Sequence, residues 1–201
     1  MTVIGITGPS GAGKGELSRF LNEKYGFPVL DADVIYHSLV SSPSDCVTEI
    51  KNEFGASVVR EDGSLDRKAL SEFVFGENNR DRLSLLNIIT HKHVIAEIDS
   101  SLQRFKGSEK ACIIDAPLLV EAGLCSKCDL TVSVIASKET RAERISKRDG
   151  IDHASALKRI NSQKEDEYYM LHTSHVIVND GDISLLQNAA DKIMREEGVV
   201  E

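Results

Sequence analysis

A glycine-rich segment that ends in lysine lies near the start of the chain, at residues 8–14 with the sequence GPSGAGK. An apolar run at residues 2–7 precedes it and predicts a strand, and residues 14–24 follow it with apolar side chains at helical spacing. The pattern G-x-x-x-x-G-K between a strand and a helix is typical of a loop that binds phosphate groups. The alternative is a glycine-rich turn that only joins the strand to the helix.

The chemistry of phosphate binding explains this pattern. Glycines let the backbone turn tightly, so that successive N–H groups point inward, and the helix N-terminus adds positive partial charge. The ammonium group of Lys14 would reach the β- and γ-phosphates of a bound nucleotide. The residues that we predict at the ATP phosphates are Gly8, Ser10, Gly11, Ala12, Gly13, Lys14, Gly15, Glu16 and Leu17.

The position after the lysine departs from the usual pattern. A serine or threonine hydroxyl normally holds Mg²⁺ there, whereas this chain has Gly15 followed by Glu16. Adenylate kinases also carry a glycine directly after this lysine, although they follow it with a threonine. We therefore expect Mg²⁺ to be held through water and carboxylates.

Short apolar strands alternate with helical patterns along the chain, which indicates an α/β protein with a mainly parallel sheet. We predict one domain over residues 1–201, a P-loop NTPase three-layer sandwich with a five-stranded sheet. The strands are expected at residues 2–7, 28–30, 111–115, 130–135 and 175–178. The predicted parts are a core at residues 1–33, 111–143 and 173–201, a helical insertion at residues 34–110 and a charged lid at residues 144–172. Within the insertion, Asp66 is placed to cap a helix.

Charge and composition exclude several classes of function. The formal net charge of −8 argues against a general nucleic-acid binder, because affinity for phosphate backbones depends on clustered Lys and Arg. No apolar stretch approaches the roughly 20 residues that cross a bilayer. The apolar run at residues 1–7 is too short for a signal peptide. We therefore expect a cytoplasmic protein with no membrane partner.

The redox state of the cysteines depends on the compartment in which the protein works. The cysteines are Cys46, Cys112, Cys125 and Cys128. The last two form one CxxC pair, but no second pair and no well-spaced histidines complete a zinc site. We expect reduced thiols, and metal binding by the CxxC pair is the alternative.

Carboxylates follow two of the predicted strands. Asp31 and Asp33 come after the second strand, and their spacing of two places both on one side of an extended backbone. One would accept a proton from an attacking hydroxyl and the other would orient Mg²⁺. A helix N-cap cluster is the alternative. Asp115 ends the third strand, where a carboxylate linked to magnesium or a turn cap is expected.

Small size, the helical insertion and the absence of an N-K-x-D guanine motif favour a small-molecule kinase. The segments that narrow the class are D-A-D-V-I-Y-H at residues 31–37, D-G-S-L-D-R-K-A-L at 62–70, Val74 with Phe75, His91, D-A-P-L-L-V-E at 115–121, Cys128 with Asp129, Arg144, Arg148, Gln163 and Asn179. With the glycine-rich loop and in this order, they make the chain similar to the dephospho-coenzyme A kinase family. The likeness runs over most of the length.

The resemblance implies transfer of a phosphoryl group from ATP, with Mg²⁺, to the ribose 3′-hydroxyl of dephospho-coenzyme A. It implies that Asp33 takes the hydroxyl proton, and that Lys14 and the lid arginines Arg144 and Arg148 stabilise charge on the transferred group. Asp33 and Asp115 would be the metal carboxylates. Asn179 would lie at ATP. The residues predicted at the acceptor are Asp31, His91, Asp115, Leu118 and Leu119, the two leucines beside the pantetheine arm.

Some of these roles have structural alternatives. Arg144 and Arg148 lie four apart and would share a helix face toward the ATP phosphates. A solvated basic helix that includes Arg141, Lys147 and Lys158 is the alternative. A lone histidine on a helix, as at His91, is often structural.

Departures from the family pattern keep two other functions open. Lys92 replaces a proline, and residues 163–169 (QKEDEYY) lack the proline of Q-M-P-x-E-x-K and add acidic side chains. One alternative is a kinase for AMP or another small metabolite, and the other is a nucleotide-binding regulator without transfer. The expected partners are ATP and dephospho-coenzyme A, with no nucleic acid, and the chain is expected to be a monomer or a weak homo-oligomer.

Overall fold

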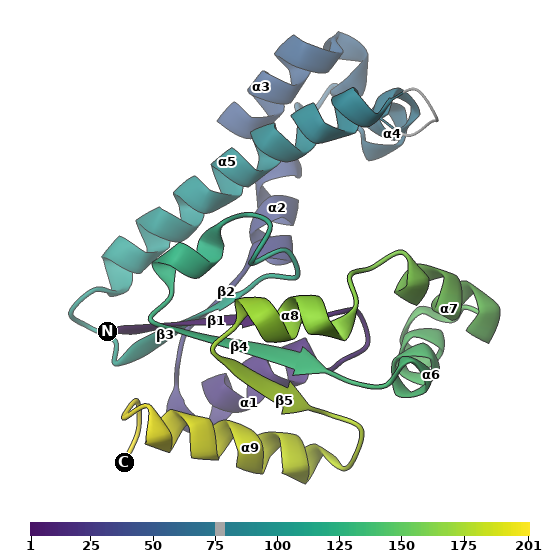
Figure 1. The fold of residues 1–201 in the computed structure, drawn as a ribbon. Coiled ribbons are helices and arrows are strands. Elements are labelled where there is room, and N and C mark those ends of the chain that lie inside the picture. The colour runs from purple at the N-terminus through teal and green to yellow at the C-terminus, as the bar shows by residue number, and fades with distance from the viewer. Residues whose placement is uncertain (75–78) are drawn as a thin grey trace. The chain divides into compact units, whose positions relative to one another are not determined.

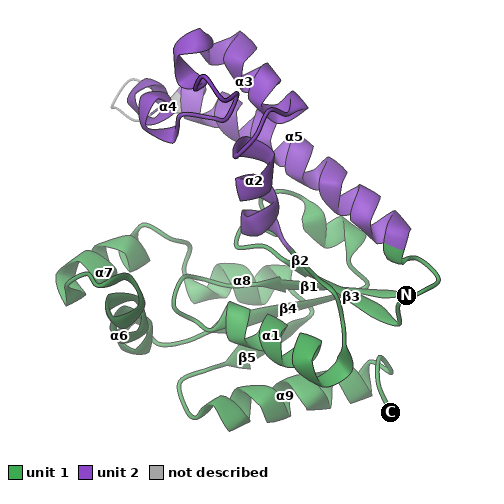
Figure 2. Cartoon of the chain, turned by 180° about the vertical axis from the view of Figure 1, so that it is seen from behind, with its two compact units in different colours: residues 1–30, 105–201 green, residues 31–104 purple. Residues whose placement is uncertain are grey.

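The computed structural model describes residues 1–74 and 79–201 of the chain. Phe75 of the predicted Val-Phe pair lies outside them. The chain divides into two compact units, which Figure 2 distinguishes by colour. Unit 1 comprises Met1–Leu30 and Phe105–Glu201, and unit 2 comprises Asp31–Arg104.

A five-stranded sheet forms the centre of unit 1, with strand order β2-β3-β1-β4-β5. The strands are β1 (Thr2–Thr7), β2 (Val29–Asp31), β3 (Ala111–Asp115), β4 (Leu130–Ile135) and β5 (His175–Val178). β1 pairs in parallel with both β3 and β4, and β4 pairs in parallel with β5. The predicted α/β fold with a mainly parallel sheet is confirmed.

Helices cover both faces of this sheet, which gives three layers (Figure 1). On one face, α1 (Lys14–Tyr25) and α9 (Ile183–Glu196) contribute Leu17, Leu21 and Leu186 to a core that also contains Ile4 and Ile113. On the other face lies α8 (Asp166–His172). Because the middle strands are covered on both sides, they read as nearly continuous apolar runs.

The carboxyl ends of the parallel strands meet at one edge of the sheet. Ile6 pairs with Asp115 across β1 and β3, and Ile135 pairs with Val178 across β4 and β5. The segments that leave these strands therefore begin side by side, and this edge is where open α/β sheets bind ligands.

Two further helices of unit 1 follow β4. They are α6 (Lys138–Asp149) and α7 (His153–Asn161), and they pack together through Ala142, Ile145, Ala156 and Ile160. Ser137 caps α6 and Asp152 caps α7 by accepting backbone N–H bonds. A short 3₁₀ turn, η2 (Leu124–Lys127), precedes β4.

Unit 2 is helical in its described residues. It contains α2 (Ala32–Val40), α3 (Asp45–Phe54), the 3₁₀ turn η1 (Ala56–Val58), α4 (Arg67–Val74) and most of α5 (Arg80–Phe105). Its own core includes Ile50, Val58 and Leu65. Asp66 caps α4, as predicted, because its Oδ1 accepts the N–H groups of Lys68 and Ala69 at 3.0 Å each.

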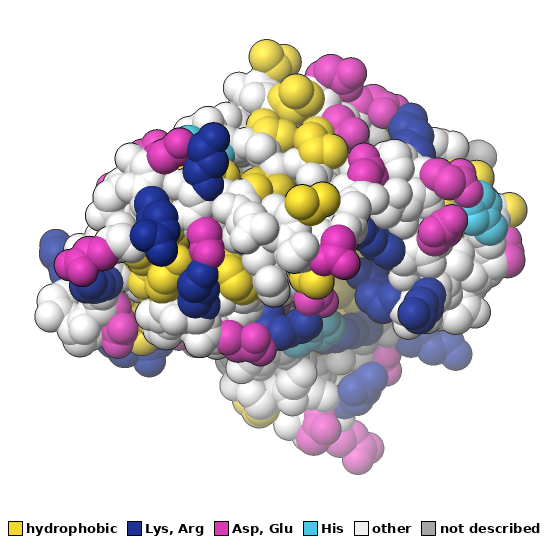
Figure 3. Space-filling model, turned by 90° about the horizontal axis from the view of Figure 1, so that it is seen from below, with side chains coloured by type: hydrophobic (Ala, Val, Ile, Leu, Met, Phe, Trp, Pro, Cys, Tyr) yellow, Lys and Arg dark blue, Asp and Glu magenta, His cyan; other side chains and the backbone are white. Residues whose placement is uncertain are grey.

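No helix formed by the described residues has the length and apolar character needed to cross a membrane. Acidic and basic side chains are intermixed over much of the face drawn in Figure 3.

Candidate active site

The backbone of the loop at residues 8–14 requires glycine at several positions. Gly8, Gly11 and Gly13 have φ angles of 141°, 80° and 107°. A Cβ atom on Gly8 would lie 2.1 Å from the carbonyl oxygen of Val134, and one on Gly13 would lie 2.2 Å from Nδ2 of Asn179. The left-handed conformation and the close approach of neighbouring atoms both exclude larger residues.

Side chains from outside the loop hold its carbonyl groups. Arg141 Nε donates to the carbonyl oxygen of Ser10 at 3.0 Å. Arg144 Nη1 contacts the carbonyl oxygens of Gly11 and Ala12 at 3.4 and 3.3 Å, and Asn179 Nδ2 donates to that of Ala12 at 2.7 Å. The carbonyls are thus engaged from α6 and from the end of β5.

The amides of the same loop have a different environment. No acceptor in the described part of the chain takes the N–H groups of Gly11, Gly13 or Lys14. These amides begin the N-terminus of α1, where the helix dipole favours anions. A row of unpaired N–H groups at a helix N-terminus is a site for phosphate.

Lys14 is paired with the carboxylate at the end of β3. Its Nζ lies 2.7 Å from Asp115 Oδ1, and Ser18 Oγ donates to Asp115 Oδ2 at 2.7 Å. Asp115 and Ser18 are buried, at 3% and 4% exposure. Sequence reasoning missed Ser18, although its position one helical turn after Lys14 places both on one side of α1.

The two predicted lid arginines differ in their contacts. Arg144 reaches the loop, whereas Arg148 binds Asp149 through Nε–Oδ1 and Nη2–Oδ2 contacts of 2.7 and 3.0 Å. Arg159 also contacts Asp149, and these guanidinium groups lower the pKa of Asp149 to about 2. Arg144 and Arg148 therefore have different protein partners, and the second arginine that contacts the loop is Arg141.

The expected extended arrangement of Asp31 and Asp33 is wrong. Asp31 ends β2, but Asp33 lies in the first turn of α2. Asp31 Oδ1 accepts the N–H groups of Asp33 at 2.8 Å and Val34 at 3.0 Å, so the N-cap alternative is confirmed for Asp31. The alternative wins because this side-chain oxygen satisfies two otherwise unpaired N–H groups of the helix.

Another contact joins two of the segments in unit 2 that resembled the kinase family. Arg67 follows the cap of α4 and contacts the ring nitrogen Nδ1 of His37 in α2. Its guanidinium also lies 5.7 Å from the centre of the Tyr36 ring. Residues 31–37 and 62–70 are therefore adjacent within this unit.

The two leucines predicted at the acceptor are in different environments. Leu119 is fully buried and packs so closely on Gly5 that a Cβ there would lie 2.8 Å from Leu119 Cδ2. It therefore offers no open surface to a ligand, in contrast to the prediction. Leu118 is 47% exposed and remains accessible.

Other predicted residues have identifiable surroundings. Asn179 is buried and supports the loop from outside through Ala12, so the described contact is with the loop itself. Glu16 lies on the outer side of α1 and pairs with Arg19 at 2.8 Å. Its carboxylate is therefore not directed to Lys14. His91 is a half-buried residue of α5.

The donor set fits a magnesium ion only in part. Among the described residues, no group of three or more His, Cys, Asp or Glu side chains could hold a metal ion. Mg²⁺ at nucleotide sites needs fewer protein ligands, since phosphate oxygens and waters complete its octahedron. Asp115, a hard oxygen donor next to Lys14, fits that role.

The comparison with protein families now decides between the classes of P-loop protein. The family model described as dephospho-CoA kinase matches residues 2–184. The chain belongs to the dephospho-CoA kinase family.

Curated relatives agree over the whole chain. A dephospho-CoA kinase of Corynebacterium glutamicum is 33% identical over 200 residues, covering 98% of this chain and 97% of the relative. A dephospho-CoA kinase of Dehalococcoides mccartyi is 36% identical over 197 residues, covering 98% of each. The matched family and these relatives are named as kinases, which are transferases that use ATP.

Solved structures support the same fold. A crystal structure from Thermus thermophilus matches with a TM-score of 0.79 and 29% identity, covering 97% of each chain. The dephospho-CoA kinase of Campylobacter jejuni matches with a TM-score of 0.62 at 23% identity, over 97% of this chain and 96% of the other. At that identity the second match supports the fold alone.

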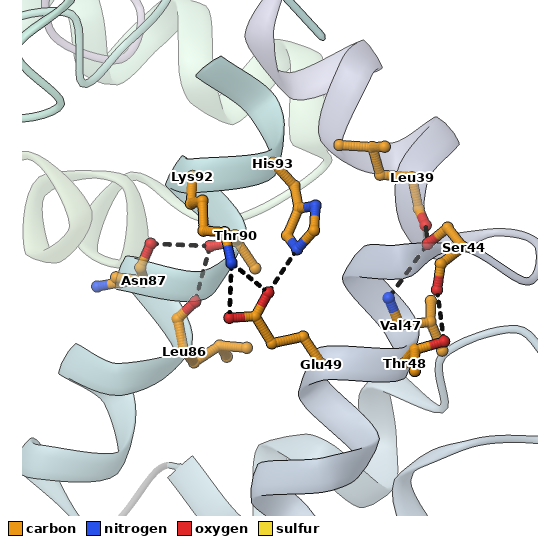
Figure 4. A network of polar contacts seen from close by, with 10 residues as sticks. All are labelled: Leu39, Ser44, Val47, Thr48, Glu49, Leu86, Asn87, Thr90, Lys92 and His93. Carbon is orange, nitrogen blue, oxygen red and sulfur yellow. Dashed lines mark hydrogen bonds and ion pairs between the residues drawn. The ribbon is translucent and has the colours of Figure 1, made fainter. Parts of the chain in front are cut away.

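One departure from the dephospho-CoA kinase pattern has a structural explanation within unit 2. Lys92 stands where the family has proline, and its Nζ binds both carboxylate oxygens of Glu49 at 3.0 and 2.8 Å. His93 Nε2 contacts the same carboxylate at 2.7 Å (Figure 4). Lys92 thus helps to join α5 to α3, a role that proline has no polar group to perform.

Gly15 is the second departure. A Cβ on Gly15 would meet nothing within 4 Å, and its φ lies outside the left-handed range. Unlike Gly13, it is therefore not required by the backbone or by packing.

Proposed function

We propose that this chain transfers the γ-phosphoryl group of ATP to the ribose 3′-hydroxyl of dephospho-CoA. The observation that carries the proposal is the pairing of Lys14 with Asp115 at 2.7 Å beside a loop with unpaired amides. This arrangement is suited to a triphosphate, because the amides and the ammonium group neutralise its charge. Family membership supplies the acceptor.

Residues of the loop and of α6 have different roles in this proposal. The loop amides hold the ATP phosphates, and Lys14 stabilises the negative charge on the transferred group. Arg144 contacts the loop through Nη1 alone, so its remaining N–H groups are the ones we assign to the phosphates. Arg148 is assigned to the closed form of a lid at residues 144–172.

Asp33 is the residue that we assign as the base for the 3′-hydroxyl. Its position in the first turn of α2 places the carboxylate at the positive end of the helix dipole. A weak base is sufficient, since phosphoryl transfer depends mainly on positioning and electrostatic stabilisation. The acceptor would be held by the insertion at residues 34–110, with His91, and by Leu118.

Asp115 and Asp33 are the carboxylates that we assign to Mg²⁺, through water where necessary. When bound, Mg²⁺ neutralises charge on phosphate oxygens. Ser18 supports this assignment for Asp115, because its hydroxyl donates to Oδ2 at 2.7 Å and fixes the orientation of the carboxylate.

We further propose that the protein works in the cytoplasm as a monomer or a weak homo-oligomer. The four cysteines are free thiols in the structure, which is consistent with a reducing compartment.

The identity of the phosphoryl acceptor is tested with a panel of candidate compounds. Purified protein is incubated with ATP, Mg²⁺ and either dephospho-CoA, AMP or shikimate, and the products are identified by mass spectrometry. The proposal predicts product from dephospho-CoA, lost in Lys14→Ala and strongly reduced in Asp33→Asn. Faster turnover of AMP would favour the alternative kinase. ATP binding without any product would favour the regulator.

A further inference from the structure

Arg141 is the largest side chain that is fully buried in the described part of the chain. It belongs to α6 and is only 2% exposed. Charged side chains are rarely buried unless hydrogen bonds and an opposite charge compensate for lost hydration. The function proposed above gives it no role.

The contacts of Arg141 form a closed ring with one residue of the phosphate loop. Its Nε donates to the carbonyl oxygen of Ser10 at 3.0 Å, and its Nη2 donates to Gln163 Oε1 at 2.8 Å. The same Gln163 oxygen accepts the N–H of Ser10 at 3.1 Å. Both backbone polar groups of Ser10 are therefore held by one pair of side chains.

The carboxylate of Asp166 supplies an opposite charge near the guanidinium of Arg141. Asp166 Oδ1 lies 3.8 Å from Arg141 Nη1 and has no hydrogen-bond partner among the described residues. Burial raises the pKa of Asp166, and the charge of Arg141 opposes that rise. The acidic character of residues 163–169, a departure from the family pattern, thus places a counter-charge beside a buried guanidinium.

The helix that carries Arg141 also touches the loop directly. A Cβ on Gly11 would lie 2.7 Å from the carbonyl oxygen of Arg141 and 3.1 Å from Ile145 Cγ1. Ser10 is thus fixed by hydrogen bonds, and Gly11 is confined by the backbone of α6. Two positions of the phosphate loop, Ser10 and Gly11, are therefore held in place by residues outside the loop.

We propose that Arg141 and Gln163 are positioning residues that hold the phosphate loop in its nucleotide-binding conformation. A loop ordered in advance loses less conformational entropy when the phosphates bind. The inference rests on the proposed nucleotide site but not on the identity of the acceptor. Nucleotide affinity should therefore depend on this pair even when no acceptor is present.

The test measures ADP binding to the full-length protein by calorimetry in the presence of Mg²⁺ and without acceptor. Gln163→Leu removes the shared oxygen, and Gln163→Glu retains it opposite Arg141. Arg141→Met removes both donors. The matched controls are Gln187→Leu in α9 and Lys147→Met, an exposed position of α6. Circular dichroism melts show which variants are folded at the assay temperature.

Gln163→Leu and Arg141→Met are expected to weaken ADP binding roughly tenfold, the effect of losing a hydrogen bond to a charged or buried group. Gln163→Glu and both controls should bind as the wild type does. The double variant should lose about as much as either single variant, because both side chains hold Ser10.

Wild-type affinity in folded Gln163→Leu, or equal losses in Gln163→Leu and Gln163→Glu, would overturn the proposal. If Arg141→Met does not fold, the comparison of Gln163→Leu with Gln163→Glu tests the proposal without it. A loss of ADP affinity in a protein that makes no CoA would support this inference and contradict the proposed acceptor, so the two failures are distinguishable.

Discussion

Ser18 Oγ donates to Asp115 Oδ2 at 2.7 Å. Ser18 lies one helical turn after Lys14 in α1, so this hydrogen bond joins α1 to the end of β3. Lys14 Nζ donates to Oδ1, the other oxygen of the same carboxylate, also at 2.7 Å. Each oxygen of this buried carboxylate thus has a donor, as buried charges require. Asp115 therefore holds the lysine ammonium beside the loop.

Removing the Ser18 hydroxyl should destabilise the protein. Ser18→Ala leaves Asp115 Oδ2 buried without this donor, and we expect the free energy of unfolding to fall by about 1–3 kcal/mol. The control is Ser162→Ala, whose exposed hydroxyl donates to the carbonyl oxygen of Arg159. Urea unfolding measures both. Equal effects in the two variants would show that the hydrogen bond to Asp115 has no special weight.

The side-chain amide of Asn179 should stabilise the loop, because its Nδ2 donates to the carbonyl oxygen of Ala12. In Asn179→Asp an oxygen replaces Nδ2 opposite the carbonyl oxygen of Ala12, so a buried attraction becomes a repulsion. ATP affinity is expected to fall roughly tenfold or more. Asn188→Asp, at an exposed position of α9, makes the same chemical change away from the loop. Titration with a fluorescent ATP analogue compares them, and unchanged binding in Asn179→Asp would contradict the assignment.

Gly13 and Gly15 should respond differently to alanine. Gly13 has a φ of 107° and a Cβ there would collide with Asn179, so Gly13→Ala should cost about 1–3 kcal/mol of stability. Gly15 has open space in the first turn of α1, so Gly15→Ala should raise stability by up to about 1 kcal/mol. Thermal unfolding of both variants tests the contrast, which fails if Gly15→Ala is as destabilised as Gly13→Ala.

The buried thiols of Cys46 and Cys112 and the half-buried thiol of Cys128 should react slowly with alkylating reagents. Burial raises the pKa of Cys128 to about 12, and that of Cys46 and Cys112 to about 11. Only the thiolate reacts, so at pH 8 the folded protein should be alkylated far more slowly than the unfolded chain, and the rate should rise with pH. Mass spectrometry with iodoacetamide follows each site. Reaction of Cys46, Cys112 or Cys128 at the unfolded rate would contradict the raised thiol pKa values.

The fold was largely predictable because its signals are local. The strands at residues 2–7, 111–115, 130–135 and 175–178 have the predicted bounds, because each is a short apolar run. The second strand lies one residue further along, at Val29–Asp31. Its last residue is also the cap of α2, and such boundaries depend on hydrogen bonds that periodicity does not report.

The site was less predictable because it depends on contacts between distant segments. Arg141, Arg144 and Arg148 recur along one helix, and their spacing does not say which of them meets the loop. Arg141 was grouped with a solvated helix in the alternative interpretation but is buried. Leu119, predicted at the acceptor, is buried against Gly5. In each case tertiary packing decides which side chain faces the loop, the core or solvent.

The most direct test of the central claim is the stoichiometry of the reaction. ATP, Mg²⁺ and dephospho-CoA are incubated with the wild type and with Lys14→Ala, and ADP and CoA are quantified together by chromatography and mass. We expect CoA and ADP to form in equal amounts with the wild type, and neither to form appreciably without the Lys14 ammonium. ADP formed without CoA, or CoA formed equally well by Lys14→Ala, would contradict the account.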